Sequence, residues 1–222
     1  MTVTKKVNFL MNIMKEWDLI MLEVEQTKII TLIYGRWKYN INTIEAIENR
    51  RSIRNFKTDK ISKEIVEDIL NCGRLAPSAK NRQPWYFVIV QDEMKNKIAD
   101  MMINYTIHND DTIERKKLGC ASSVNPTANV IKQAPILVLV FREKNDNWII
   151  GDNLSIGACV ENMCLRATDL GIGSLWIRDI VYVSENVAKM LGHGDLELNC
   201  AVSLGVPNQN PKQRPKKSCL MQ

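Results

Sequence analysis

Two basic segments, far apart in the chain, carry the residues best suited to binding an anion. They contribute Arg50, Arg51, Ser52 and Arg54 from the first segment, and Lys212 and Arg214 from the second. Guanidinium groups donate paired hydrogen bonds in one plane and a hydroxyl adds a neutral donor, so together they match a phosphate monoester. The pattern predicts a site for the phosphate of a bound cofactor. The alternative for each segment alone is a solvated charge patch, because surface Arg and Lys are common.

The rest of the composition offers few other catalytic groups. Only His108 and His193 are histidines, and the chain has no Gly-x-Ser-x-Gly motif, so neither a histidine-rich metal site nor a Ser–His hydrolase is indicated. The six cysteines show neither paired metal-ligand spacing nor a Cys-x-x-Cys motif, and we expect reduced thiols in a cytoplasmic protein. We expect no metal and no catalytic side chain.

Charge and hydropathy argue against nucleic acid and membrane as partners. The net charge of +5 would suit nucleic acid, but the basic residues are scattered and lack interleaved aromatics, so a nucleic-acid-binding protein is the weakest hypothesis. No apolar run approaches the roughly 20 residues that span a bilayer, and we expect no membrane segment. A chain of 222 residues, 45% of them hydrophobic, can bury the core of one domain.

The elements that must position the basic residues mix helices and strands irregularly. Helices are predicted from Asn42 or Thr43 into the arginine segment, from Ser62 until Pro77 ends it, and over 93–104, 152–170 and 184–191; strands are predicted over 85–90, 136–141, 172–177 and 198–204. Because strict βαβ alternation is missing, the pattern predicts an α+β fold with helices packed on a central sheet. The polar stretch 106–128 is predicted to be a helix-plus-loop excursion covering a site.

A loop and a glycine turn add further polar and backbone donors. Residues 77–85 are bracketed by prolines and rich in amide and hydroxyl groups, which is typical of a loop. Gly171 is expected to end the long helix. Gly171 and Gly173 begin like a Gly-x-Gly-x-x-Gly dinucleotide fingerprint, but they follow a helix and the third position is Trp176, so the fingerprint fails.

The order and spacing of these motifs resemble the FMN-dependent nitroreductase family. The matching segments are 49–56, 76–78 with Asn81 and 83–85, 169–174 with Trp176, 205–207 and 211–215, so the resemblance covers about residues 42–218. It implies a nitroreductase-like α/β sandwich, with a central, mostly antiparallel sheet flanked by helices. It also implies an intertwined homodimer with FMN bound at the subunit interface.

The resemblance implies a role for each matching residue. Arg50, Arg51, Ser52, Lys212 and Arg214 would hold the FMN phosphate, and Arg54 would lie near the ribityl chain or the pyrimidine edge. Pro77, Ser78, Asn81 and Gln83 would reach the flavin from the other subunit, and Ile172, Gly173 and Ser174 would approach it with their backbone. From the residues alone, Asn81 and Gln83 serve equally well to satisfy the loop backbone, and Trp85 and Trp176 are interpreted as core aromatics.

The implied activity is that of an FMN-dependent oxidoreductase. By a ping-pong mechanism, hydride would pass from NADH or NADPH via flavin N5 to a small electron acceptor such as a nitroaromatic or a quinone. The alternative keeps the fold and FMN for another reaction, flavin fragmentation or dehalogenation, or for flavin binding without turnover.

Residues 1–41 are predicted to be an N-terminal extension, and residues 42–222 a single FMN-binding domain. The extension is open to three interpretations: an arm wrapping the partner subunit, a disordered leader, or an artefact of an upstream start codon. We favour an artefact or a weakly ordered arm.

Overall fold

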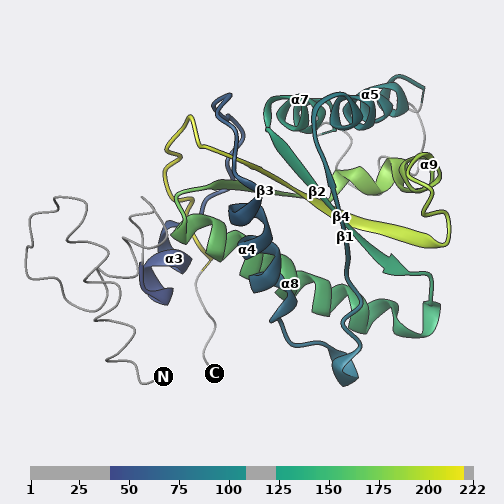
Figure 1. Ribbon diagram of the computed structural model, residues 1–222, viewed down its shortest axis with the longest axis horizontal. Coiled ribbons are helices and arrows are strands. Elements are labelled where there is room, and N and C mark those ends of the chain that lie inside the picture. The colour runs from purple at the N-terminus through teal and green to yellow at the C-terminus, as the bar shows by residue number, and fades with distance from the viewer. Residues whose placement is uncertain (1–40, 109–123, 218–222) are drawn as a thin grey trace, which may run out of the picture. The chain divides into compact units, whose positions relative to one another are not determined.

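The computed structural model describes residues 41–108 and 124–217 of the chain (Figure 1). The predicted N-terminal extension therefore lies outside the described residues except for Ile41, as does most of the excursion predicted over 106–128. In chain order the elements are α3 (Thr43–Asn49), α4 (Lys63–Arg74), η1 (Ala79–Asn81), β1 (Tyr86–Val90), α5 (Asp92–His108), α7 (Val124–Gln133), β2 (Ile136–Glu143), η3 (Asp146–Trp148), α8 (Ile149–Asp169), β3 (Gly173–Ile177), η4 (Asp179–Val183), α9 (Ser184–Met190) and β4 (Leu196–Gly205).

The four strands form one antiparallel sheet in the order β1-β2-β4-β3. Helices α4 and α8 cover one face, and α5, α7 and α9 cover the other (Figure 1). The α+β class and the antiparallel sheet flanked by helices, both predicted from the sequence, are confirmed.

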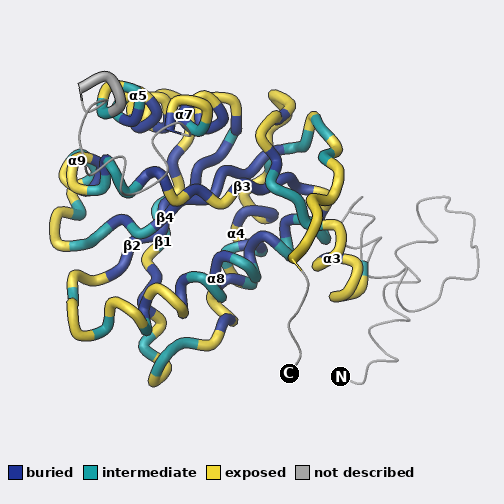
Figure 2. The backbone as a smooth tube through the Cα atoms, turned by 180° about the vertical axis from the view of Figure 1, so that it is seen from behind, coloured by how far each residue is buried: buried dark blue, intermediate teal, exposed yellow. Residues whose placement is uncertain are grey.

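Alternation along the central strands divides the core between the two faces. In β2, Leu137, Leu139 and Phe141 pack toward α5, α7 and α9, whereas Ile136, Val138 and Val140 pack toward α4 and α8. All six side chains are buried, as expected for a strand with a helical layer on each face. Figure 2 shows this buried centre, with exposure concentrated on the outer helices and loops.

Some elements match the sequence predictions closely, and one was not predicted. Asn42 is a true N-cap, with a capping box to Glu45. The helix predicted over 184–191 is α9, and the hydroxyl of its first residue, Ser184, accepts the N–H of Leu198 at 3.0 Å. Helix α7 was not predicted as an element of its own.

The two tryptophans interpreted as core aromatics have different environments. Trp85 is buried, which confirms that interpretation, but Trp176 is 42% exposed, so the interpretation is wrong for Trp176. The reason is that β3 is an edge strand, where Leu175 and Ile177 face the core and Trp176 points the other way. Its ring lies over α8 near Gly157.

The turn after α8 has the predicted helix stop. Gly171 has φ of +68°, a left-handed conformation that glycine adopts at low cost. The N–H of Ile172 donates to the carbonyl of Ala167 at 2.8 Å, and that of Gly171 donates to Thr168 at 3.0 Å. These bonds satisfy the last carbonyls of α8 and turn the chain directly into β3.

The buried cysteines should be chemically inert. Burial raises the pKa of Cys159 to about 12, of Cys164 to about 11 and of Cys200 to about 12. At pH 8 we expect maleimide to modify these thiols roughly a thousandfold more slowly than an exposed cysteine, because the thiolate is the reacting form. Peptide mass spectrometry of native protein, with urea-unfolded protein and the half-buried Cys72 as controls, measures this; rapid native labelling of Cys159 would contradict it.

The same pKa shifts set the direction of a pH effect on stability. In the folded protein these thiols stay neutral above the pH at which they ionise in the unfolded chain. Their contribution is therefore complete below about pH 8.5 and is lost as pH rises toward 11–12. Urea midpoints should fall over that alkaline range.

The described residues contain neither a candidate membrane span nor a candidate metal cluster. Over 41–108 and 124–217, no helix combines the length and apolar character needed to cross a membrane. Nor do the same residues include a group of three or more His, Cys, Asp or Glu side chains placed to hold a metal ion.

Candidate functional site

The arginine segment is held between β3 and the chain that follows β4. The N–H of Ile53 donates to Ser174 O at 2.9 Å, and that of Lys57 donates to Val206 O at 2.8 Å. The N–H of Asn208 in turn donates to Asn55 O at 3.0 Å. These backbone bonds hold residues 52–57 alongside both β3 and the C-terminal tail, although the two segments are about 150 positions apart in sequence.

Two buried side chains anchor this segment against glycines. Ile53 and Phe56 are 7% and 6% exposed, and they alternate with polar residues that face outward. A Cβ on Gly173 would lie 3.0 Å from the Ile53 side chain, and one on Gly205 would lie 2.7 Å from Phe56 Cδ1. The glycines therefore provide the space that lets the arginine segment approach the sheet.

The two predicted basic segments meet around one cavity of about 300 Å³. It is lined by Arg50, Arg51, Ser52, Arg54, Gln209, Pro211, Lys212, Gln213, Arg214 and Lys216. Within the described part of the chain, this lining includes six Lys or Arg residues and no acidic one. All six residues that the sequence analysis assigned to an anion are thus brought together, while their role in holding FMN stays a prediction.

Arg51 shows that the cavity is suited to an anion. One terminal nitrogen, Nη1, donates to the carbonyls of Glu48 and Arg50, which holds the guanidinium in place. Its Nε is buried and has no hydrogen-bond partner among the described residues. Because this side chain lines the cavity with its Nε closed off, an anion there would be attracted by the charge of the guanidinium group as a whole.

Arg50 forms an ion pair with an acidic residue of α8. Its Nε lies 3.2 Å from Glu161 Oε1 on α8, and both side chains are partly exposed. The next residue of α8, Asn162, donates from Nδ2 to Cys72 O at 3.3 Å. These two residues therefore connect α8 to the arginine segment and to α4.

The predicted glycine turn lies next to the cavity. Ile172, Gly173 and Ser174 are all buried at the start of β3, and Ser174 forms a parallel bridge with Ser52. The backbone of this turn is therefore one strand spacing from the arginine segment. Its predicted approach to a flavin stays a prediction.

The loop with Pro77, Ser78, Asn81 and Gln83 does not line the basic cavity. It lies beside the N-terminal half of α8, and Gln83 borders a separate cavity of about 750 Å³ along β1. Gln83 Nε2 donates to Asn81 Oδ1 at 3.0 Å, and both side chains are exposed. The two amides thus bond to each other rather than to the loop backbone, and both remain exposed at the surface.

A comparison with known proteins identifies the class of protein that this fold and cavity define. Residues 47–206 match the model of the Nitroreductase family, and the chain belongs to that family. A relative from Archaeoglobus fulgidus, named as an NADH dehydrogenase/NAD(P)H nitroreductase, is 32% identical over 170 residues, which cover 74% of this chain and 84% of the relative.

Solved structures agree with this assignment. A BluB-like flavoprotein from Clostridium difficile 630 superposes with a TM-score of 0.72 at 26% identity, covering 82% of this chain and all of that one. A Desulfovibrio desulfuricans protein, assigned as a nitroreductase and solved in complex with FMN, superposes with a TM-score of 0.62 at 26% identity, covering 80% of this chain and 93% of the other.

Some residues of the basic cavity and of the region beside the 77–83 loop were not assigned a role from the sequence. Gln209, Gln213 and Lys216 line the basic cavity, and their position in the same proline-rich tail as Lys212 was the available signal. Beside the loop, Arg82 and Asp152 form an ion pair across 70 positions of sequence. A lone acid in the first turn of an apolar helix hinted at Asp152, but its partner could not be read from the sequence.

Proposed function

We propose that this member of the nitroreductase family binds FMN with its phosphate in the basic cavity and works as an NAD(P)H-dependent oxidoreductase. The carrying observation is the meeting of Arg50, Arg51 and Arg54 with Lys212 and Arg214 around one cavity that has no acidic residue in its described lining. The dianion of a phosphate monoester would offset the repulsion among these cations. The FMN complex of the Desulfovibrio relative supports the same ligand.

The flavin would supply the redox chemistry, accepting hydride at N5 from NADH or NADPH and then reducing a nitroaromatic or quinone acceptor in a ping-pong cycle. This chain's residues would bind and orient. The arginine segment and the tail would hold the phosphate, and the buried turn at 172–174 would approach the ring system with its backbone. Arg54 would supply fixed positive charge near the ribityl chain or the pyrimidine edge, where a reduced flavin is anionic.

Purified protein tests this function directly. We expect a yellow protein with flavin absorbance, or a colourless one that takes up FMN stoichiometrically, and NADH or NADPH oxidation that depends on an added nitroaromatic or quinone. Bound FMN without such turnover would instead support the alternative, another reaction or flavin binding alone. Failure to take up FMN in any preparation would reject the proposal.

We further propose that the protein works as a homodimer in which the exposed face of α8 meets its copy. Ile150 and Leu154, four residues apart on α8, are 74% and 72% exposed, and Ile149 lies beside them. Large apolar side chains grouped on one helix face are typical of protein interfaces. The loop at 77–83 lies beside this half of α8, so a partner seated there would also meet Asn81 and Gln83.

Leu154→Glu is expected to shift the protein to monomers and to weaken FMN binding at least about tenfold, because an unpaired carboxylate would be buried at the interface. Sedimentation velocity and FMN fluorescence quenching measure the two effects. Met94→Glu is the matched control, since Met94 is also an exposed apolar residue but lies on α5, in the opposite layer. A dimer that survives Leu154→Glu would show that this face of α8 is not the interface.

A further inference from the structure

The loop from Ser78 to Gln83 has an unusual backbone. Lys80, Asn81 and Gln83 have φ values of +51°, +53° and +48°. These values lie in the left-handed region, which residues other than glycine seldom adopt. Three such residues among four need contacts from outside the loop to hold them. Backbone strain of this kind is often stored where a loop must present side chains in one geometry.

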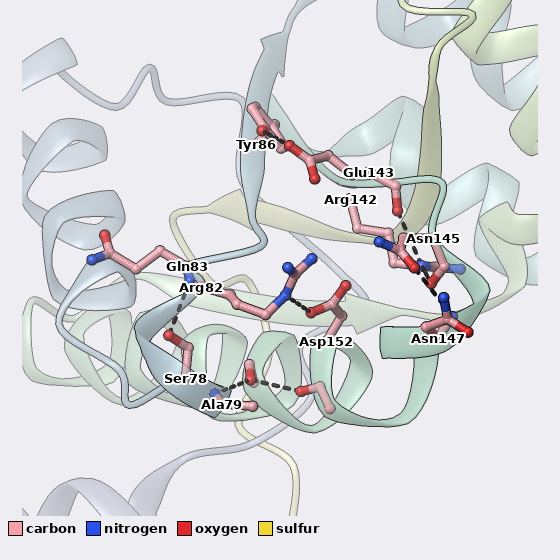
Figure 3. A network of polar contacts seen from close by, with 12 residues as sticks. Ser78, Ala79, Arg82, Gln83, Tyr86, Arg142, Glu143, Asn145, Asn147 and Asp152 are labelled. Carbon is pink, nitrogen blue, oxygen red and sulfur yellow. Dashed lines mark hydrogen bonds and ion pairs between the residues drawn. The ribbon is translucent and has the colours of Figure 1, made fainter.

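Contacts from α8 and its preceding turn surround the base of this loop (Figure 3). The N–H of Ala79 donates to Ser155 Oγ at 3.2 Å, and that hydroxyl donates to Gly151 O at 2.6 Å. At the other end of the loop, the Arg82 side chain points toward the first turn of α8, and its Nε lies 3.3 Å from Asp152 Oδ1 (Figure 3).

Asp152 is the unusual member of this set. Its side chain is 1% exposed, and its Oδ2 is buried with no hydrogen-bond partner in the part of the chain that the structure describes. A carboxylate in such a place is costly unless a cation compensates it, and Arg82 is the cation in contact with it. The first turn of α8 adds the positive end of a helix dipole.

The ring of Trp148 contacts both basic residues of the loop. Arg82 Cζ lies 4.7 Å from the centroid of the Trp148 ring, and Lys80 Nζ lies 5.2 Å from it, both within cation–π range. Asp152 and Trp148 thus fix the two basic residues of the loop. The amides of Asn81 and Gln83, linked at 3.0 Å, remain exposed on the outer side.

We propose that Asp152 is a positioning residue: through Arg82, and with Trp148, it holds the Ser78–Gln83 loop in its left-handed conformation and so presents Asn81 and Gln83 to the flavin. The flavin part of this proposal rests on the proposed function. Asp152 itself touches neither reacting atoms nor, on this proposal, the cofactor. Its effect is to remove the free-energy cost of ordering the loop at the moment of binding.

The loop carries its own probe, because trypsin cleaves after Lys80 and Arg82. In Asp152→Asn, which keeps the shape and removes the charge, we expect cleavage at these bonds in the flavin-free protein to rise about tenfold, since local opening controls proteolysis of a native chain. The FMN dissociation constant should rise by about tenfold as well. Mass spectrometry of the fragments and fluorescence quenching measure the two effects.

Asp68→Asn is the matched control. Asp68 pairs with Arg166 of α8 at 2.6 Å, so the change removes the same charge from the same layer without touching the loop. Loop cleavage and FMN affinity should stay within about twofold of wild type. If Asp68→Asn matches Asp152→Asn, the effect is general loosening of this layer and the proposal is overturned.

A double-mutant cycle tests whether Asp152 acts through Arg82. Arg82→Gln removes the trypsin site after residue 82, so cleavage is compared after Lys80 alone. There Arg82→Gln should reproduce the rise in cleavage, and it should also reproduce the loss of FMN affinity. Adding Asp152→Asn to it should change either by less than about twofold. Additive effects would overturn the proposal. Circular dichroism shows whether Asp152→Asn folds. If it does not, Arg82→Lys and Trp148→Leu test the same contacts through the partners of the loop. Unchanged cleavage in both variants would overturn the proposal.

The two proposals fail in different ways. A wild-type protein that never binds FMN rejects the proposed function but leaves the trypsin comparison intact. A wild-type protein that binds FMN, with unchanged cleavage and affinity in Asp152→Asn, rejects the positioning role alone.

Discussion

Arg51→Glu is expected to weaken FMN binding by about 100-fold or more, because it removes a charge-assisted hydrogen bond and places a carboxylate against the phosphate. The buried Nε of Arg51 has no partner among the described residues and lies in a segment that lines the cavity. Titration of the flavin-free protein with FMN, followed by fluorescence quenching, measures the change.

Riboflavin provides the control for this prediction, since it lacks the phosphate. Wild-type protein should prefer FMN to riboflavin strongly, and Arg51→Glu should bring the two dissociation constants close together. Lys57→Glu makes the same charge change in the same segment, at a residue outside the cavity lining, and should keep most of the preference. Undiminished FMN preference in Arg51→Glu would place the phosphate elsewhere.

Gly205→Val is expected to destabilise the fold by about 3 kcal/mol, because a side chain there has no space. A Cβ on Gly205 would lie 2.7 Å from both Phe56 Cδ1 and Pro135 Cδ, and neither ring can move far. For a domain of this size, the loss corresponds to a fall of roughly 6–12 °C in melting temperature. Urea unfolding followed by circular dichroism measures it.

Gly194→Ala is the comparison for Gly205→Val. A Cβ on Gly194 would meet no described atom within 4 Å, so its stability should change by less than about 0.5 kcal/mol. Because Phe56 anchors the arginine segment, Gly205→Val should also weaken FMN binding, whereas Gly194→Ala should not. Equal melting temperatures for the two variants would contradict the packing described around Phe56.

The elements that could be predicted from the sequence are those marked by hydrophobic periodicity or by a helix-ending glycine. The apolar run 136–141 and the long period of 152–170 predicted β2 and α8 because their residues face the core regularly, and Gly171 marked the helix end by its backbone freedom. The two basic segments were predicted to converge because several cations and a hydroxyl suit one anion better than separate patches. The structure does bring them around one cavity.

Other features depend on contacts that the sequence does not show. Trp176 was interpreted as buried because it lies in an apolar strand, but its exposure is decided by β3 being an edge strand. The pairs Arg50–Glu161 and Arg82–Asp152 join residues that are far apart in sequence. Each of these residues is of a charged type that is usually exposed, so nothing in the sequence marks it as paired. Their partners are set by how α8 packs, which periodicity cannot reveal.

The hydrogen bonds between residues 52–57 and the chain after β4 determine when, during synthesis, the basic cavity can form. The backbone partners Asn55 and Asn208 are 153 positions apart, so a nascent chain cannot complete the anion cradle until its tail has left the ribosome. Before that moment, the arginines repel one another with no ligand to balance them. Flavin capture would then require synthesis to have passed Lys212 and Arg214, and a product truncated before Lys212 would stay colourless even if its sheet had formed.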